Sequence, residues 1–89
     1  MKEEKMGKMI ESLQETAAER GYTAILKLLL SVDKDADLEY LMCLASSGGH
    51  METIRFLLSK GAVITSSAIN MARNHSYYGT ALYLKRMRR

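Results

Sequence analysis

Three side chains carry the chemistry most often used in nucleophilic or metal-dependent catalysis: Cys43, His50 and His75. A cysteine thiolate acts as a nucleophile when a nearby histidine can take its proton. His50 follows Cys43 by about two helical turns, and a Gly-Gly pair interrupts the helix between them. A zinc site needs three or four ligands at recognisable spacings, which these residues lack. We therefore predict that Cys43 is a small buried apolar residue and that both histidines are structural turn residues.

Two further patterns resemble ligand-binding loops without completing them. Asp33, Asp35 and Asp37 alternate like the start of a calcium loop, but the glycine and the distant glutamate of that motif are missing. Gly48-Gly49 lacks the other glycines and the lysine of a phosphate-binding loop. The sequence therefore predicts no metal, no cofactor and no enzymatic activity, and the acidic segment is interpreted as a solvated turn.

Charge is distributed unevenly along the chain. Residues 1–52 carry six Lys or Arg against ten Asp or Glu, whereas residues 53–89 carry seven Lys or Arg and no acid. The folded protein is therefore expected to have an acidic end and a basic end. The strongest basic cluster is the final segment, Tyr83-Leu-Lys-Arg-Met-Arg-Arg89, which is either a solvated helix end or a contact for an acidic surface.

Length and composition place the chain among small helical domains. Its 89 residues make one domain, and 47% hydrophobic residues without any proline favour helices over disorder. The single cysteine fits a reducing compartment. No stretch approaches the ~20 apolar residues of a membrane span, and the charged start leads into no signal core. We expect a cytoplasmic (intracellular) protein without membrane contact.

The chain repeats itself. Residues 17–31 align with residues 45–59 at an offset of 28, and a fainter third repeat follows at an offset of 27. Within each repeat, apolar residues recur with a period of 3.6, so each is predicted to hold two helices. The segment 63–65 is β-prone but too short to build a sheet. Five expected helices run approximately over residues 6–20, 23–31, 38–46, 51–59 and 66–74, and a sixth runs from about residue 77 into the basic tail.

Asp37 and either Thr65 or Ser66 are predicted helix caps, and Gly21, Gly48-Gly49 and Gly61 are predicted helix ends. The apolar stripe of the first helix consists of Met6, Met9, Ile10, Leu13 and Ala17. Met9, Met42 and Met71 are expected to fill gaps in the core.

These residues resemble the ankyrin repeat family. The middle repeat carries the resemblance best, through Leu44-Ala45, Gly49-His50, Ile54-Arg-Phe-Leu-Leu58 and Lys60-Gly-Ala62. The first repeat matches through Ala17-Ala18, Gly21-Tyr22, Leu28-Leu-Leu30 and Ala36-Asp37, and the third through Met71-Ala72. The resemblance implies stacked helix pairs, with His50 bridging backbone groups of neighbouring repeats. The period is shorter than the family's 33 residues, which leaves no room for its β-hairpin fingers, and Tyr40-Leu-Met-Cys43 replaces the Thr-Pro-Leu-His motif.

The predicted fold class is therefore all-α: three stacked helix-turn-helix repeats forming an ankyrin-like solenoid in a single domain, 1–89. The repeats cover roughly residues 6–36, 37–64 and 65–86. One such pair cannot bury its own apolar stripe, so neighbouring pairs must share a core. The charged side chains of the first and last helices predict polar outer faces at both ends, as expected of a complete protein.

The sequence favours a function in protein–protein interaction, as a small adaptor or stoichiometric inhibitor. By the resemblance, partners dock on the first helix of each repeat. The basic C-terminal end, with the tyrosines near it, is a second candidate contact. The first helices supply Glu11, Ser12, Glu15, Glu19; Glu39, Tyr40, Cys43, Ser47; and Ser67, Asn70, Arg73, Asn74. The C-terminal end supplies Tyr77, Tyr78, Lys85, Arg86 and Arg88.

Two alternatives remain open at the level of sequence. The basic C-terminal third could bind nucleic acid through phosphate contacts, although no base-reading motif accompanies it. The chain could also be a monomer or associate weakly with itself, the acidic end of one copy meeting the basic end of the next.

Overall fold

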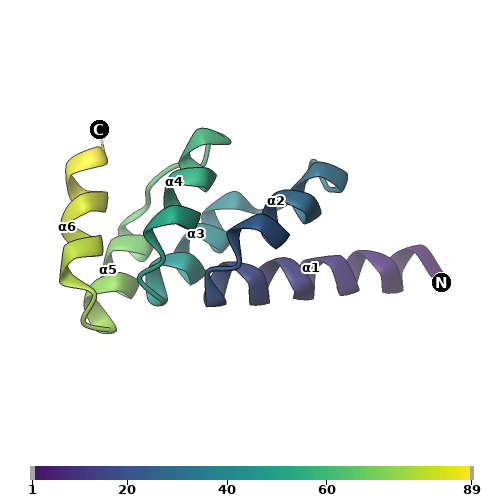
Figure 1. The fold of residues 1–89 in the computed structure, drawn as a ribbon, viewed down its shortest axis with the longest axis horizontal. Helices are drawn as coiled ribbons and strands as arrows, with labels where there is room; N and C mark the ends of the chain where they lie inside the picture. The colour runs from purple at the N-terminus through teal and green to yellow at the C-terminus, as the bar shows by residue number, and fades with distance from the viewer. Residues whose placement is uncertain (1, 89) are drawn as a thin grey trace.

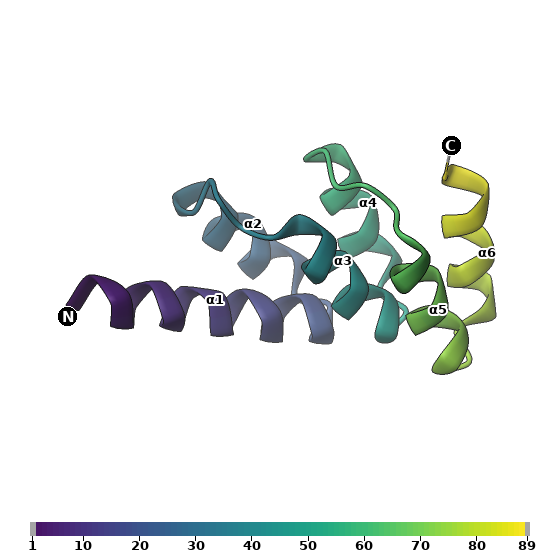
Figure 2. The ribbon, with the colours of Figure 1, turned by 180° about the vertical axis from the view of Figure 1, so that it is seen from behind.

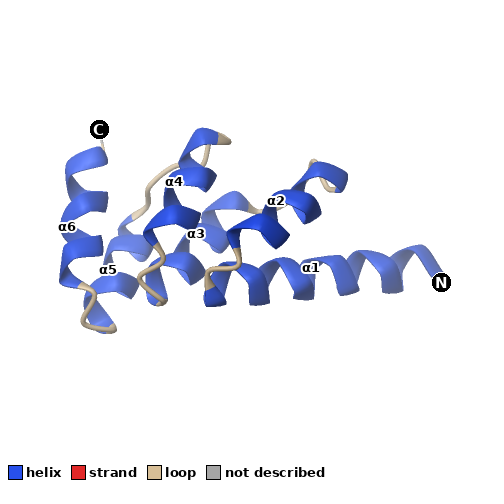
Figure 3. Cartoon of the chain, in the orientation of Figure 1, coloured by secondary structure: helices blue, strands red, loops and turns tan. Residues whose placement is uncertain are grey.

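The computed structural model describes residues 2–88. Met1 and Arg89, the last residue of the predicted basic tail, lie outside the described residues, as do the side chains of residues 2–4 of the predicted polar cap. The described part consists of six α-helices without a strand, which confirms the all-α prediction (Figure 3). The helices are α1 (Lys2–Arg20), α2 (Thr23–Val32), α3 (Leu38–Ser47), α4 (Met51–Ser59), α5 (Ser66–Asn74) and α6 (Tyr78–Met87).

The helices form two layers. Each odd-numbered helix packs against the helix that follows it, giving the pairs α1–α2, α3–α4 and α5–α6. The pairs are joined mainly through the odd-numbered helices, because α3 packs against both α1 and α5. Figures 1 and 2 show α1, α3 and α5 along one side of the molecule, with α2 and α4 along the other. The result is elongated, measuring 42 × 22 × 21 Å.

The predicted caps form. The side chain of Asp37 accepts a hydrogen bond from the backbone N–H of Tyr40 at 3.1 Å, and Thr65 accepts one from Ala68 at 3.2 Å. These bonds satisfy N–H groups that the first turn of a helix leaves without a partner. They fix where α3 and α5 begin, and therefore which side chains these helices turn toward their neighbours.

The corner between the two helices of a pair has the same geometry three times. The backbone N–H of Tyr22, His50 and Tyr77 donates to the carbonyl five residues earlier, at 2.8, 3.0 and 2.8 Å. The residue before each of these has a positive φ: 76° at Gly21, 68° at Gly49 and 67° at Ser76. A positive φ lets the chain reverse direction within two residues, and glycine adopts it without steric cost.

The corners of successive pairs pack on one another. A Cβ atom added to Gly21 would collide with the ring of His50, and one added to Gly49 would collide with the ring of Tyr77. The His50 ring also donates a hydrogen bond from Nε2 to the carbonyl oxygen of Glu19 at 2.8 Å. Each ring therefore rests on the glycine of the preceding corner and sets the spacing between two pairs.

Small side chains let the odd-numbered helices approach closely. Ala17, Ala45 and Ala72 occupy corresponding positions in α1, α3 and α5, and all three are buried. Between the layers, the core is filled by larger apolar residues that are fully buried, among them Leu26, Met42, Ile54, Leu57 and Leu84. Shape-matched burial of this kind is the main source of stability in a domain without disulfides.

Two predictions about the first helix are wrong. Met42 is buried and Met71 half-buried, as expected, but Met9 is exposed together with Met6 and Leu13. The N-terminal part of α1 runs past the end of α2 (Figure 1), and these three side chains are at least half exposed among the described residues. The outer face of the first pair is therefore not the predicted polar cap, although Lys5 and Lys8 are exposed as expected.

The corner contact predicts opposite effects for two glycine substitutions. Gly49→Ala should lower the free energy of unfolding by at least ~1–2 kcal/mol, because alanine is strained at positive φ and its methyl group displaces Tyr77. Gly79→Ala, in the open first turn of α6, should raise it by about 0.5 kcal/mol through helix propensity. Urea denaturation at one fixed protein concentration measures both. Equal effects of the two substitutions would contradict the role of the corner.

Candidate functional site

Eight of the residues predicted to bind a partner line two separate depressions, and the others lie outside both. Asn70, Arg73, Tyr78, Lys85 and Arg88 line a depression between α5 and α6. Glu11, Glu15 and Tyr40 line another between α1, α3 and the turn that connects α2 to α3. The first depression is thus on the last helix pair, whereas the second is between the first pair and the middle pair.

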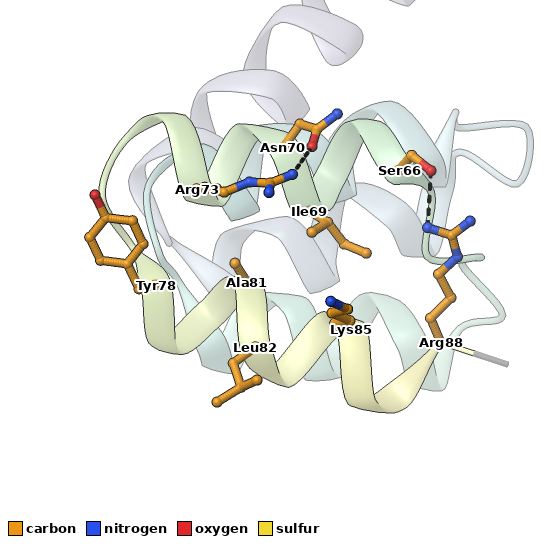
Figure 4. Close-up of a pocket in the computed structure, with 9 residues that line it drawn as sticks. All are labelled: Ser66, Ile69, Asn70, Arg73, Tyr78, Ala81, Leu82, Lys85 and Arg88. Carbon is orange, nitrogen blue, oxygen red and sulfur yellow. Dashed lines mark hydrogen bonds between the residues drawn. The ribbon is translucent and has the colours of Figure 1, made fainter.

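The depression between α5 and α6, here called the basic groove, has a volume of about 400 Å³. Its lining consists of Ser66, Ile69, Asn70, Arg73, Tyr78, Ala81, Leu82, Lys85 and Arg88 (Figure 4). Ile69 and Ala81 are partly buried and form an apolar floor between the cationic side chains. Tyr78 and Leu82, which are 66% and 51% exposed, add apolar surface at the rim.

Hydrogen bonds hold two of the three cations of the basic groove in place. Arg73 donates to the Asn70 side chain, and Arg88 donates to the Ser66 hydroxyl at 3.0 Å. Such tethering lowers the entropy lost when a guanidinium later binds an anion. No Asp or Glu side chain of the described residues lines the groove, and the sequence has no Asp or Glu after Glu52. The basic groove is thus a positively charged surface with an apolar floor.

The second depression, here called the acidic depression, has a volume of about 360 Å³. It is lined by Glu11, Gln14, Glu15, Asp33, Asp35, Ala36, Asp37, Tyr40 and Leu41. Several carboxylates already have structural partners: Gln14 donates to Asp33 at 3.0 Å, and Asp37 caps α3. The solvated acidic turn expected from the sequence is the part of this surface that connects α2 to α3.

The remaining predicted residues lie outside both depressions. Glu39 accepts a hydrogen bond from the backbone of Val63 at 3.2 Å, and Ser47 donates to the carbonyl of Leu44. Tyr77 packs on Gly49 in the corner described above. The side chains exposed to solvent without a described contact are Ser12, Glu19, Ser67, Asn74 and Arg86.

Sequence reasoning missed the apolar part of the basic groove, to which α5 contributes Ile69 and α6 contributes Ala81 and Leu82. It considered the first helices and the basic tail separately, so it did not identify Ile69, Ala81 or Leu82. The one available signal was the spacing of Tyr78, Leu82 and Lys85, which places an apolar residue between a tyrosine and a lysine on one helical face.

Both histidines are engaged with backbone groups. His50 donates to Glu19 of the preceding pair, and His75 donates from Nδ1 to the carbonyl oxygen of Met71 at 2.9 Å. Each ring thereby has one nitrogen committed to the fold. The geometry accords with the structural role expected for His50 and with the turn role expected for His75.

Cys43 is half-buried between α3 and the start of α5, and its sulfur lies 4.0 Å from the hydroxyl of Thr65. Burial raises the pKa of the Cys43 thiol; the hydrogen bond to Thr65 opposes this change, and the negative charge of Asp37 adds to it. The thiol therefore stays protonated at neutral pH, which is unfavourable for nucleophilic attack.

Comparison of the chain with protein-family models, with curated proteins and with solved structures finds no match. The ankyrin resemblance therefore rests on the residues of this chain alone. None of the helices between residues 2 and 88 combines the length and apolar character needed to cross a membrane. In the same part of the chain, no three His, Cys, Asp or Glu side chains are arranged to hold a metal ion.

The raised pKa predicts slow chemistry at Cys43. Because only the thiolate reacts, the folded protein should react with iodoacetamide at pH 8 more slowly than the same chain in urea. The rate should increase with pH beyond the range in which a free cysteine has already ionised. A reaction at pH 7 that is faster for the folded than for the unfolded chain would contradict the assignment.

Proposed function

We propose that this chain is an ankyrin-like binding module without catalytic activity, acting as a small adaptor or stoichiometric inhibitor. Its binding site is the basic groove, and its ligand is an acidic segment of another protein that also presents an apolar side chain. The observation that carries the proposal is the pairing of three cations with an apolar floor in one groove.

The ankyrin-like part of the proposal is supported by the repeated corner. The same backbone hydrogen bond and the same positive φ recur at offsets of 28 and 27 residues, in register with the sequence repeats. The His50 bridge to the preceding pair is the contact that the resemblance implies. Repeat folds of this kind function by presenting an extended surface to a partner.

The composition of the basic groove supports an acidic, partly apolar ligand. Arginine binds a carboxylate through two parallel hydrogen bonds, and both Arg73 and Arg88 have donors facing the groove (Figure 4). Tyrosine and arginine are also the residues most enriched where binding energy concentrates. An apolar side chain of the ligand would lie on Ile69 and Ala81, between the charged contacts.

The contacts of Cys43 and of the two histidines also support a binding role. Cys43 is held as a thiol, and one nitrogen of each histidine ring is hydrogen-bonded to the backbone. No nucleophile and general base are adjacent among them, because Cys43 contacts Thr65 instead of a histidine.

Nucleic acid is the alternative ligand, favoured by the absence of any acid in residues 53–89. Binding would then depend mainly on phosphate contacts and would weaken steeply with salt. The apolar floor favours the protein ligand, because a phosphate backbone offers nothing to cover it.

The proposal predicts that a groove variant loses its partner. The tagged chain is used to recover proteins from a nuclease-treated extract of the native host, and the partner is then purified. Arg73→Glu with Lys85→Glu should weaken its binding at least tenfold, because two charge-assisted contacts become repulsive. The matched control, Lys34→Glu with Arg55→Glu, makes the same charge change on exposed residues outside the groove and should bind like the unchanged protein.

Two results would contradict the proposal. Loss of every partner after nuclease treatment, with salt-sensitive binding to DNA or RNA, would favour the nucleic-acid alternative. Equal binding by the groove variant and the control would show that the partner contacts another surface.

A further inference from the structure

An apolar face lies at the end of the stack opposite the basic groove. Three side chains of α1 and three of α2 form it, and each is at least half exposed: Met6, Met9, Leu13, Ile25, Leu28 and Val32. We call this set the N-terminal face. In both helices the three residues are spaced by three and then four positions, so each trio forms one straight row along its helix.

The alignment of the repeats shows which positions of the second helix pair correspond to the N-terminal face. At the offset of 28 residues, Leu13 aligns with Leu41, and Ile25 aligns with Thr53. Leu13 is 50% exposed but Leu41 only 2%; Ile25 is 53% exposed but Thr53 is fully buried. The second pair has a neighbour on this side, whereas no described helix pair precedes the first.

Contacts between α2 and α4 identify that side. The hydroxyls of Thr23 and Thr53 lie 2.6 Å apart, and Nζ of Lys27 lies 5.5 Å from the centre of the Phe56 ring. Phe56 aligns with Leu28, which is 70% exposed. Thr53 and Phe56 thus face the preceding pair, so Ile25 and Leu28 face the place where another helix pair would pack. The N-terminal face therefore has the position of a surface between two helix pairs, and no described pair packs on it.

We propose that a second copy of this chain covers the N-terminal face, forming a two-fold symmetric dimer in which α1 packs antiparallel against α1 of the other copy. Six large apolar side chains, at least half exposed, present on the order of 500 Å² of apolar surface, as much as a whole monomer usually tolerates in one patch. Burying it in both copies, with the surrounding polar rim, approaches the ~800 Å² per partner of a stable interface.

The spacing of α1 fits this partner. Met6, Met9, Leu13 and Thr16 follow the three-four alternation of a helix that packs along a left-handed seam. In an antiparallel pair with this register, Met9 meets Leu13 of the second copy, and Met6 meets Thr16. α1 is 19 residues long, about twice the length of any other helix, and the part that extends beyond α2 would gain a neighbour.

Charge complementarity supports the antiparallel direction. Lys5, Ser12 and Glu19 are exposed and lie seven residues apart on one flank of the row. In the antiparallel pair, Lys5 of each copy faces Glu19 of the other copy, which gives two opposite-charge pairs. Ser12 of one copy faces Ser12 of the other at the two-fold axis. A parallel arrangement would place Lys5 against Lys5 and Glu19 against Glu19, which is repulsive.

A head-to-tail association fits the surfaces less well. It would place the N-terminal face against the far side of α5–α6, where Arg73 and Lys85 would be covered by apolar side chains. It would also leave both terminal faces of each assembly open, so that growth continues into a filament. The two-fold dimer closes after two copies and leaves both basic grooves exposed, so it does not depend on the function proposed for them.

The test measures the mass of the 89-residue chain by sedimentation equilibrium between 1 and 200 µM. The unchanged protein should shift from monomer to dimer without larger species. Leu28→Glu should weaken dimerisation at least tenfold, because symmetry introduces the buried charge twice. The controls are Val63→Glu, at an equally exposed apolar residue outside the N-terminal face, and Leu82→Glu on the opposite end; both should dimerise normally. Circular dichroism confirms that each variant is folded.

A charge exchange tests the direction of packing. Lys5→Glu alone and Glu19→Lys alone should each weaken the dimer, and the two together in one chain should restore it. Loss of association in Leu82→Glu as well as Leu28→Glu would indicate the head-to-tail arrangement and overturn the proposal. A monomer at every concentration would also overturn it.

Discussion

The stack depends on one contact, repeated at each junction: an aromatic ring packed on a glycine of positive φ. His50 packs on Gly21 and Tyr77 on Gly49, and in both cases a Cβ atom would occupy the space of the ring. The third corner has Ser76 at the same φ, and no described pair follows it to bring a ring against that position. The two corners on which a ring packs therefore have glycine, and the corner on which no described ring packs has a residue with a side chain.

This contact sets the conditions for the rest of the fold. With the corners held together, α3 packs between α1 and α5, and Ala17, Ala45 and Ala72 are buried at corresponding positions of the three helices. The open ends then acquire different characters. The C-terminal end exposes cations around an apolar floor, on which the proposed acidic ligand would lie, whereas the N-terminal end exposes a row of apolar side chains. Two surfaces of different chemistry, far apart on a 42 Å molecule, can act independently.

Much of this architecture could be predicted from the sequence. Most helix bounds followed from caps and glycines, although α1 begins at Lys2 and not near Met6. The cap signal located Asp37, the 28-residue register located Gly49, and the apolar stripe located Met42. The outer face of the first pair could not be predicted, because an amphipathic stripe such as Met6–Met9–Leu13 indicates that a helix face is buried but not which element buries it. The basic groove was predicted only in part, since its floor comes from two helices whose facing residues depend on packing. Periodicity identifies the apolar side of a helix, but only the tertiary arrangement decides whether a neighbour is present.

Solution NMR tests whether ring-on-glycine contacts at the corners hold the helix pairs in a stack. We expect nuclear Overhauser effects from the Hα protons of Gly49 to the ring of Tyr77, and from those of Gly21 to the ring of His50. We also expect ring-current shifts of these glycine protons that disappear in Tyr77→Ala and His50→Ala. Glycine protons at ordinary chemical shifts, without cross-peaks to either ring in the folded protein, would show that the rings do not pack on the glycines.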